Sequence, residues 1–149
     1  MPAMTHKIIL AADHAGFPLK QSVMQLLQSK GYEVLDLGTN TGDSVDYPDF
    51  GQAAAKAILD GKAEQGIVIC GTGIGISISA NRFKGIRCAL CGDVETAELA
   101  RRHNNANMLA LAGRSLSLEQ AEKIISAFLD TEFEGGRHQN RIVKIDNPA

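Results

Sequence analysis

The stretch CGTGIG, residues 70–75, places a thiol before three glycines at alternate positions, Gly71, Gly73 and Gly75. It follows an apolar run and precedes a small, partly polar one, so we expect it to join a buried strand to a helix. Backbone N–H groups in such a loop, together with a helix N-terminus, can hold an anion. A tight turn without a ligand is the alternative, but three glycines exceed what one turn usually requires. The pattern favours an anion site.

Two common phosphate motifs do not fit this loop. No Lys-Ser or Lys-Thr pair follows the glycines, as a P-loop requires, and Ile76 stands where the dinucleotide fingerprint has glycine or alanine. ATP and NAD are therefore weaker candidates for the ligand.

Cys70 ends the apolar run, next to the glycine loop. Backbone donors and a helix N-terminus would stabilise its thiolate, which can act as a nucleophile or as a base. A cysteine at the end of an apolar strand is equally typical of a small core residue, so position alone leaves both interpretations open.

Cys88 and Cys91 form a C-x-x-C pattern within a predicted strand. Residues three apart in a strand point to opposite faces of the sheet, and no second ligand pair lies near them in the sequence. We interpret both as structural thiols, and we expect no metal site.

Two pairs of polar residues follow predicted elements. Asp13 and His14 come directly after the first strand, where they could face a ligand; an Asx-type turn with an exposed imidazole is the alternative. His103 and Asn104 end a predicted helix, where a solvated helix cap explains them equally well without a ligand. His6 lies in no motif and is expected at the surface.

Basic residues gather near the C-terminus. Arg137 and Arg141 are four apart, which on a helical turn presents both guanidinium groups to one side, as a clamp on phosphate requires. A solubilising basic face is the alternative. Arg114 adds a cation after the last predicted strand.

Apolar runs and amphipathic stretches alternate along the chain. The runs that predict strands are residues 7–13, 32–38, 66–70, 85–93 and 107–113. The stretches that predict helices are residues 16–31, 48–61, 74–83, 94–103 and 117–130. This alternation predicts an α/β fold, a three-layer αβα Rossmann-like domain with a five-stranded parallel sheet. Such sheets bind ligands at the carboxyl ends of their strands, where the motifs above lie.

Bulk properties limit the function further. Residues 1–149 fit a single domain, with the polar, basic residues 131–149 as a C-terminal extension. A net charge of −2 argues against a nucleic-acid partner. No apolar stretch is long enough to span a membrane, and MPAMTHK lacks the features of a secretory signal, so we expect a cytoplasmic protein with three free thiols and a small ligand.

Five segments together, AADHAG, DYPDF, ICGTGIGISISANR, RRHNNANMLALAGR and EGGRHQNR, resemble ribose-5-phosphate isomerase type B and its galactose-6-phosphate isomerase relatives. The resemblance covers nearly the whole chain in the family's order. It implies an aldose–ketose isomerase that moves a proton between C1 and C2 of a sugar phosphate through an enediolate, with no metal or organic cofactor.

The resemblance also implies roles for single residues. Cys70 would remove and return the proton, and Thr72 with its glycine loop would hold the developing oxyanion. His103 would open the furanose ring by acid/base transfer. Some relatives carry a carboxylate where this chain has Ile76 and lack the cysteine, so this chain resembles the thiol version.

The remaining matched positions are implied to contact the substrate. These substrate-binding positions are Asp13, His14, Tyr47, Gly71, Gly73, Ile74, Gly75, Asn104, Arg114, Arg137, His138 and Arg141. Of these, Arg114, Arg137 and Arg141 match the cations that hold the phosphate. The family's sites lie between two chains, so a homodimer or homotetramer with shared sites is implied.

Three alternatives stay open at this point. The substrate could be a six-carbon sugar phosphate, allose or galactose 6-phosphate, because loop geometry sets the length of the pocket. The chain could bind a sugar phosphate or nucleotide without catalysis, which would make Cys70 dispensable. A thiol-redox protein built on Cys88 and Cys91 is the third possibility.

Overall fold

The computed structural model describes residues 6–149. Residues 1–5, which form most of the segment MPAMTHK in which we expected no secretory signal, lie outside the described part. The core is one parallel sheet of five strands in the order β2-β1-β3-β5-β4. The strands are β1 (Lys7–Ala12), β2 (Glu33–Asp36), β3 (Gln65–Cys70), β4 (Cys88–Leu90) and β5 (Met108–Ala112). The predicted Rossmann-like α/β fold is confirmed.

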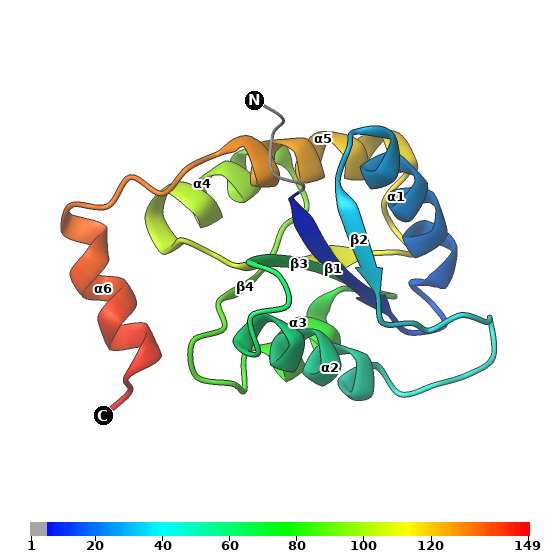
Figure 1. Ribbon diagram of the computed structural model, residues 1–149, viewed down its shortest axis with the longest axis horizontal. Coiled ribbons are helices and arrows are strands. Elements are labelled where there is room, and N and C mark those ends of the chain that lie inside the picture. The colour runs from blue at the N-terminus through cyan, green and yellow to red at the C-terminus, as the bar shows by residue number, and fades with distance from the viewer. Residues whose placement is uncertain (1–5) are drawn as a thin grey trace.

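Helices cover both faces of this sheet (Figure 1). The helices are α1 (Phe17–Ser29), α2 (Tyr47–Leu59), α3 (Ile74–Ala80), α4 (Val94–Asn104), α5 (Leu118–Asp130) and α6 (Arg137–Asp146). Apolar residues of α1, α4 and α5 form one buried cluster with the sheet. Those of α2 and α3 form the other. None of the described helices is long and apolar enough to cross a membrane.

The central strand β3 is nearly all apolar because helices cover both of its faces. Every residue of it is buried, and its side chains alternate between the two clusters: Ile67 and Ile69 pack on one face, Val68 and Cys70 on the other. A strand covered on both faces needs apolar residues at every position rather than at alternate ones.

The ends of two helices follow the expected signals. Pro18 lies in the first turn of α1, and Gly31, just past its end, has a φ of +91°. Ser117 and Gln120 form a capping box at the start of α5, with both reciprocal hydrogen bonds present. Pro18 has no N–H that the first turn could leave unpaired, and the N–H of Gly31 donates to the carbonyl of Gln28. The capping box of α5 satisfies two backbone N–H groups at the start of that helix.

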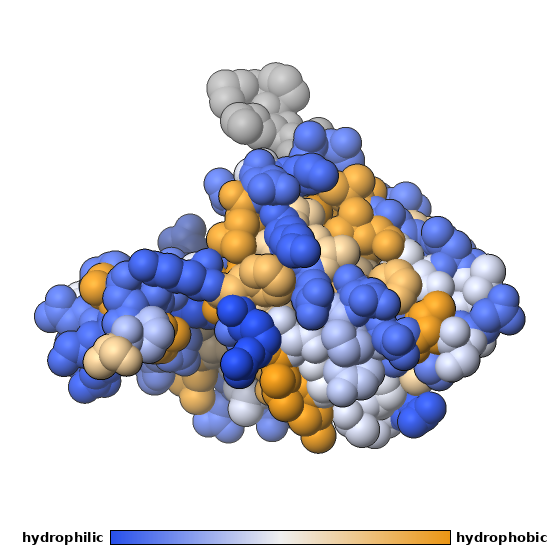
Figure 2. Space-filling model, turned by 90° about the horizontal axis from the view of Figure 1, so that it is seen from below, coloured by the Kyte–Doolittle hydropathy of each residue, from blue (hydrophilic) through white to orange (hydrophobic). Residues whose placement is uncertain are grey.

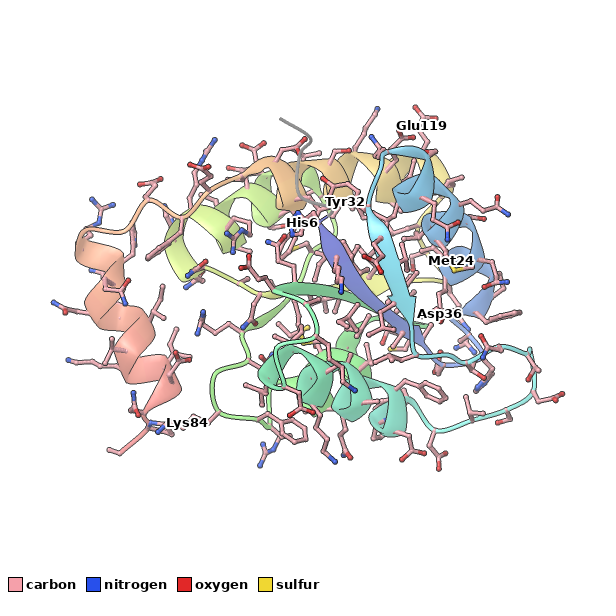
Figure 3. The ribbon with its side chains drawn as sticks, in the orientation of Figure 1. His6, Met24, Tyr32, Asp36, Lys84 and Glu119 are labelled. Carbon is pink, nitrogen blue, oxygen red and sulfur yellow. The ribbon has the colours of Figure 1, made fainter. Side chains whose placement is uncertain are left out.

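Other boundaries differ from the sequence prediction. Helix α3 ends at Ala80, because the chain turns there, and the Asn81 side chain then hydrogen-bonds both the N–H and the carbonyl of Cys88. The C-terminal extension holds a regular helix, α6, where the sequence indicated only a helical turn. His6 is half-buried rather than at the surface, because its ring packs edge-on against Tyr32, 5.5 Å between centroids (Figure 3).

Helix α6 stands apart from the rest of the fold (Figure 1). Within it only His138 and Ile142 are buried. Arg87, just before β4, holds its far end through an ion pair of 2.8 Å to Asp146. Val143 and Ile145 are about half exposed, at 49% and 51%. Seen from below, this protruding helix carries hydrophobic side chains among hydrophilic ones (Figure 2).

Candidate active site

The three central strands, β1, β3 and β5, end at nearly the same height in the sheet. The loops that follow them therefore lie side by side. Ala12 of β1 pairs with Ile69 of β3, and Cys70 pairs with Ala112 of β5. From β1 the chain adds β2 on one side and β3 on the other, so the direction in which strands are added reverses between β1 and β3. Open α/β sheets bind ligands at such a switch point.

A cavity of about 450 Å³ lies at this edge of the sheet. It is lined by Asp13, His14, Ala15, Tyr47, Cys70, Gly71, Thr72, Ile74, Gly75, Ile78 and Arg114. The structure therefore brings together the predicted residues that follow β1, β3 and β5, and Tyr47 joins them from the start of α2.

Cys70 lines the cavity although its side chain is only 4% exposed. The backbone N–H of Gly73 donates a hydrogen bond to its Sγ over 3.2 Å. This contact fixes the sulfur at the start of the glycine loop. Cys70 is thus both a core residue of β3 and a group at the cavity, so the two interpretations of its position are compatible.

The glycines of the loop make room for specific neighbours. Gly73 has a φ of +76°, and a Cβ on it would meet the carbonyl carbon of Leu111 at 3.0 Å. A Cβ on Gly71 would lie 3.0 Å from Nη1 of Arg114, and one on Gly75 would overlap the ring of Tyr47. The missing side chains therefore let a guanidinium and an aromatic ring close over the loop.

Asp13 and His14 are fixed by backbone amides. Oδ1 of Asp13 accepts the N–H of Gly16 over 2.9 Å, the Asx-type turn that the sequence left open. Nδ1 of His14 accepts the N–H of Val45 over 3.1 Å. Because Nδ1 is an acceptor, the neutral imidazole carries its proton on Nε2, which leaves His14 a donor for a ligand.

The other predicted residues lie elsewhere in the chain. His103, Asn104, Arg137, His138 and Arg141 do not line the cavity of Cys70. They come from the end of α4 and the start of α6. Within one chain the predicted site is thus divided into two groups.

In the second group, the rings of His103 and His138 stack with 4.4 Å between centroids and 16° between planes. Burial lowers the pKa of His138, and the neighbouring His103 and Arg137 lower it further. Glu134, which the sequence analysis did not select, offers a carboxylate close to both imidazoles. Its spacing of four from His138 was the one signal in the sequence that could have indicated it.

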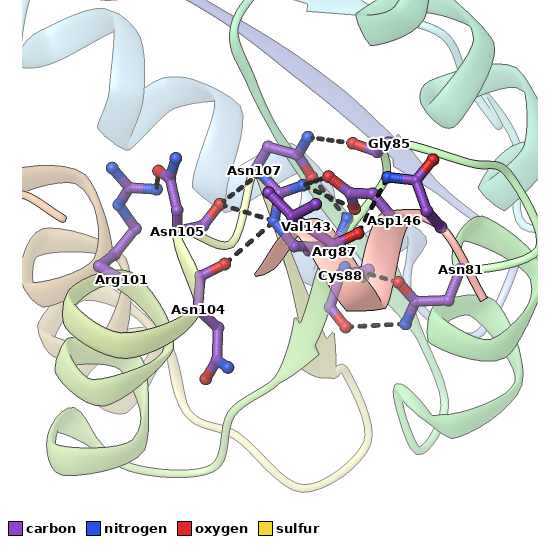
Figure 4. Close-up of polar contacts among 11 residues, drawn as sticks. Asn81, Gly85, Arg87, Cys88, Arg101, Asn104, Asn105, Asn107, Val143 and Asp146 are labelled. Carbon is purple, nitrogen blue, oxygen red and sulfur yellow. Dashed lines mark hydrogen bonds and ion pairs between the residues drawn. The ribbon is translucent and has the colours of Figure 1, made fainter. Parts of the chain in front are cut away.

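Asn104, which directly follows His103, also contacts Arg87 and lines a second cavity. Its carbonyl accepts a hydrogen bond from Nε of Arg87 over 3.0 Å (Figure 4). It lines a larger cavity, of about 660 Å³, between residues 81–89 and the end of α6. The same guanidinium binds Asp146, so Arg87 joins the end of α4 to α6.

Cys88 and Cys91 pack on opposite faces of the sheet, as predicted. Burial raises the pKa of Cys88 to about 12, and it also raises the pKa of Cys91. Both are unpaired and protonated at neutral pH, so neither is suited to thiol exchange.

The fold and the cavity define a Rossmann-like α/β protein with a thiol, an imidazole and a guanidinium around one cavity at the carboxyl edge of the sheet. The model of the Ribose/Galactose Isomerase family matches residues 8–145. Ribose-5-phosphate isomerase B of Escherichia coli (strain K12) is 45% identical over 139 residues, covering 93% of this chain and 93% of that protein. The chain belongs to the ribose/galactose isomerase family, which confirms the resemblance and the expected enzyme class.

Solved structures agree with this assignment. A ribose 5-phosphate isomerase from Thermotoga maritima matches with a TM-score of 0.94 at 52% identity, covering 96% of this chain and 99% of the other. The type B ribose 5-phosphate isomerase of Trypanosoma brucei also has a TM-score of 0.94, at 40% identity, covering 98% and 100%.

Proposed function

We propose that the chain interconverts ribose 5-phosphate and ribulose 5-phosphate, with Cys70 as the base. The observation that carries this proposal is the amide-bonded sulfur of Cys70 in a cavity that it shares with Arg114. The names of the relatives support the choice of sugar, because those in Escherichia coli and Thermotoga maritima are both ribose 5-phosphate isomerases.

In the proposed reaction the Cys70 thiolate removes the proton on C2 of the open-chain aldose. The electron pair of that C–H bond forms the C1–C2 double bond, and negative charge develops on the C1 oxygen. The thiol then returns the proton to C1, while the proton of the C2 hydroxyl passes to the C1 oxygen, which gives the ketose. No metal or organic cofactor takes part in these steps.

The loop after β3 supplies donors for the developing charge. Thr72 Oγ1 already accepts the N–H of Ile74 over 3.2 Å, so its own O–H is free to donate. Donors fixed before the reaction stabilise an oxyanion more effectively than donors that must reorient. Nε2–H of His14, fixed by Val45, is a further donor at the same cavity.

We place the second group of residues at the site of a neighbouring chain in a homodimer, or in a larger assembly built from such dimers. In this arrangement His103 opens the furanose ring, Asn104 binds substrate oxygens, and Arg137, His138 and Arg141 hold the phosphate. The separation of these residues from Cys70 within one chain supports the arrangement, as do the protruding α6 and its exposed Val143 and Ile145.

A cytoplasmic location suits this proposal, because the reactive thiol must stay reduced. The test is turnover by chelator-treated protein. Ribose 5-phosphate, allose 6-phosphate and galactose 6-phosphate are supplied in parallel, and the ketose product is measured. The proposal predicts the highest kcat/KM with ribose 5-phosphate. A higher value with a six-carbon sugar phosphate overturns the choice of substrate, and absence of turnover with all three overturns the activity.

A further inference from the structure

Three side chains that can bind a metal converge where α6 meets α4. One ligand atom from each of His103, Glu134 and His138 lies within 4.8 Å of the other two. Two imidazoles and one carboxylate are a ligand set that zinc accepts, with a fourth position left for water or a further ligand. Magnesium and calcium prefer oxygen ligands alone, so the set discriminates against them.

A second observation points to a ligand of His138. His138 is only 5% exposed, and its Nε2 is buried with no hydrogen-bond partner among residues 6–149. Native proteins usually satisfy such an atom with a protein group, a water or an ion. The unpartnered nitrogen belongs to the ring that stacks on His103.

We propose that His103, Glu134 and His138 bind Zn²⁺. Bonds of about 2.0–2.1 Å in a tetrahedral site bring ligand atoms to within about 3.3 Å of one another, so the three groups must close by up to roughly 1.5 Å. The ring of His103 must also turn out of its stack on His138, because the lone pair of an imidazole lies in the plane of its ring and both lone pairs must point at one ion. Glu134 is exposed and His103 is half-buried, so both have room to move. His138 is the fixed ligand, because the fold buries it.

The surrounding charges weaken the binding of a cation, so we expect Zn²⁺ to bind reversibly. Arg137 and Arg141 lie on the same helix as His138 and oppose a divalent cation, whereas Glu134 contributes a single negative charge. Bound Zn²⁺ occupies a lone pair of His103, which then cannot transfer a proton. Inhibition of the isomerase by Zn²⁺ follows, and this consequence rests on the proposed function, whereas the binding itself does not.

The test uses the untagged full chain at neutral pH. Zn²⁺ affinity is measured by competition with a chromophoric chelator, and Co²⁺ serves as a spectroscopic probe of the ligands. Glu134→Gln removes one ligand from an exposed position. Glu132→Gln is its matched control, since Glu132 is also exposed and lies outside the cluster. Cys70→Ala tests whether the ion binds the thiol instead.

We expect one Zn²⁺ per chain and a Co²⁺ spectrum without sulfur charge-transfer bands. Glu134→Gln should weaken Zn²⁺ binding at least about tenfold, while Glu132→Gln and Cys70→Ala should leave it within about twofold. Failure to bind Zn²⁺ overturns the site. So does unchanged affinity in Glu134→Gln, or loss of binding in Cys70→Ala. Turnover is measured separately, so an inactive protein that binds Zn²⁺ contradicts the proposed function and leaves the metal site standing.

Discussion

The backbone N–H of Gly73 points at the sulfur of Cys70, 3.2 Å away. This contact exists because Gly73 adopts a φ of +76° and fits between β5 and the side chain of Leu90. The conformation of one glycine thus places a donor on the proposed base.

Gly73→Ala should therefore damage both stability and activity. A side chain in the left-handed region costs about 1–3 kcal/mol, and here it also collides with Leu111. We expect the free energy of unfolding in urea to decrease by at least that range. Gly92→Ala is the control, because a Cβ on Gly92 meets nothing within 4 Å and its φ is not in the left-handed region. Equal stability of the two variants would contradict this account of the loop.

Gly71→Ala should act on substrate binding rather than on folding. The added Cβ lies 3.0 Å from Nη1 of Arg114, the flexible end of an exposed side chain, so the guanidinium can move away at little cost in stability. Loss of a charge-assisted hydrogen bond of about 1.5–3 kcal/mol raises KM for ribose 5-phosphate by about 10–100-fold. Arg114→Ala should give a similar KM. A normal KM in Gly71→Ala would show that Arg114 does not bind the phosphate from its present position.

Asp146→Asn should loosen α6. The carboxylate of Asp146 accepts two hydrogen bonds from Nη1 of Arg87, at 2.8 and 2.9 Å, in a partly buried setting. We expect faster hydrogen exchange of the α6 amides. Glu119→Gln removes an exposed pair with Lys123 and should change nothing measurable, because exposed pairs contribute little. If the α6 amides exchange at the same rate in both variants, the ion pair does not hold the helix.

His138 should make stability depend on pH. Burial, followed by the charges of His103 and Arg137, lowers its pKa below the usual 6.5. The unfolded chain therefore binds a proton near pH 6.5, and the folded chain binds it only at lower pH. Above about pH 6.5 this group does not affect the free energy of unfolding. As the pH falls below 6.5, the unfolded chain takes up the proton first, so the free energy of unfolding decreases.

The measurement compares the wild type with His138→Gln, which cannot take up the proton, from about pH 8 to about pH 5. The stability of the wild type should fall relative to that of the variant only in the acid half of the range. Parallel curves over the whole range would contradict the lowered pKa.

Much of the fold could be predicted because its signals are local. Pro18 and Gly31 bound α1, and the capping box of Ser117 and Gln120 starts α5. Helix α6 was missed as a full helix because it buries only His138 and Ile142, which is too few residues for an apolar stripe.

The candidate site was predicted in composition but not in arrangement. Residues that follow strands of one parallel sheet must meet at one edge, so the grouping of Asp13, Cys70 and Arg114 follows from topology. No local pattern states that His103 and His138 stack away from that cavity. Contacts between α4 and α6 depend on the path of the chain between them, which periodicity does not describe.

The turnover number of Cys70→Ala with ribose 5-phosphate tests the central claim most directly, with Cys70→Ser as the variant that keeps the size of the side chain. We predict that kcat falls by about 10²–10⁴-fold in both variants, while substrate affinity, measured by calorimetry, stays within about threefold of the wild type. A Cys70→Ala variant that keeps kcat within about tenfold of the wild type would contradict the role of this thiol as the base.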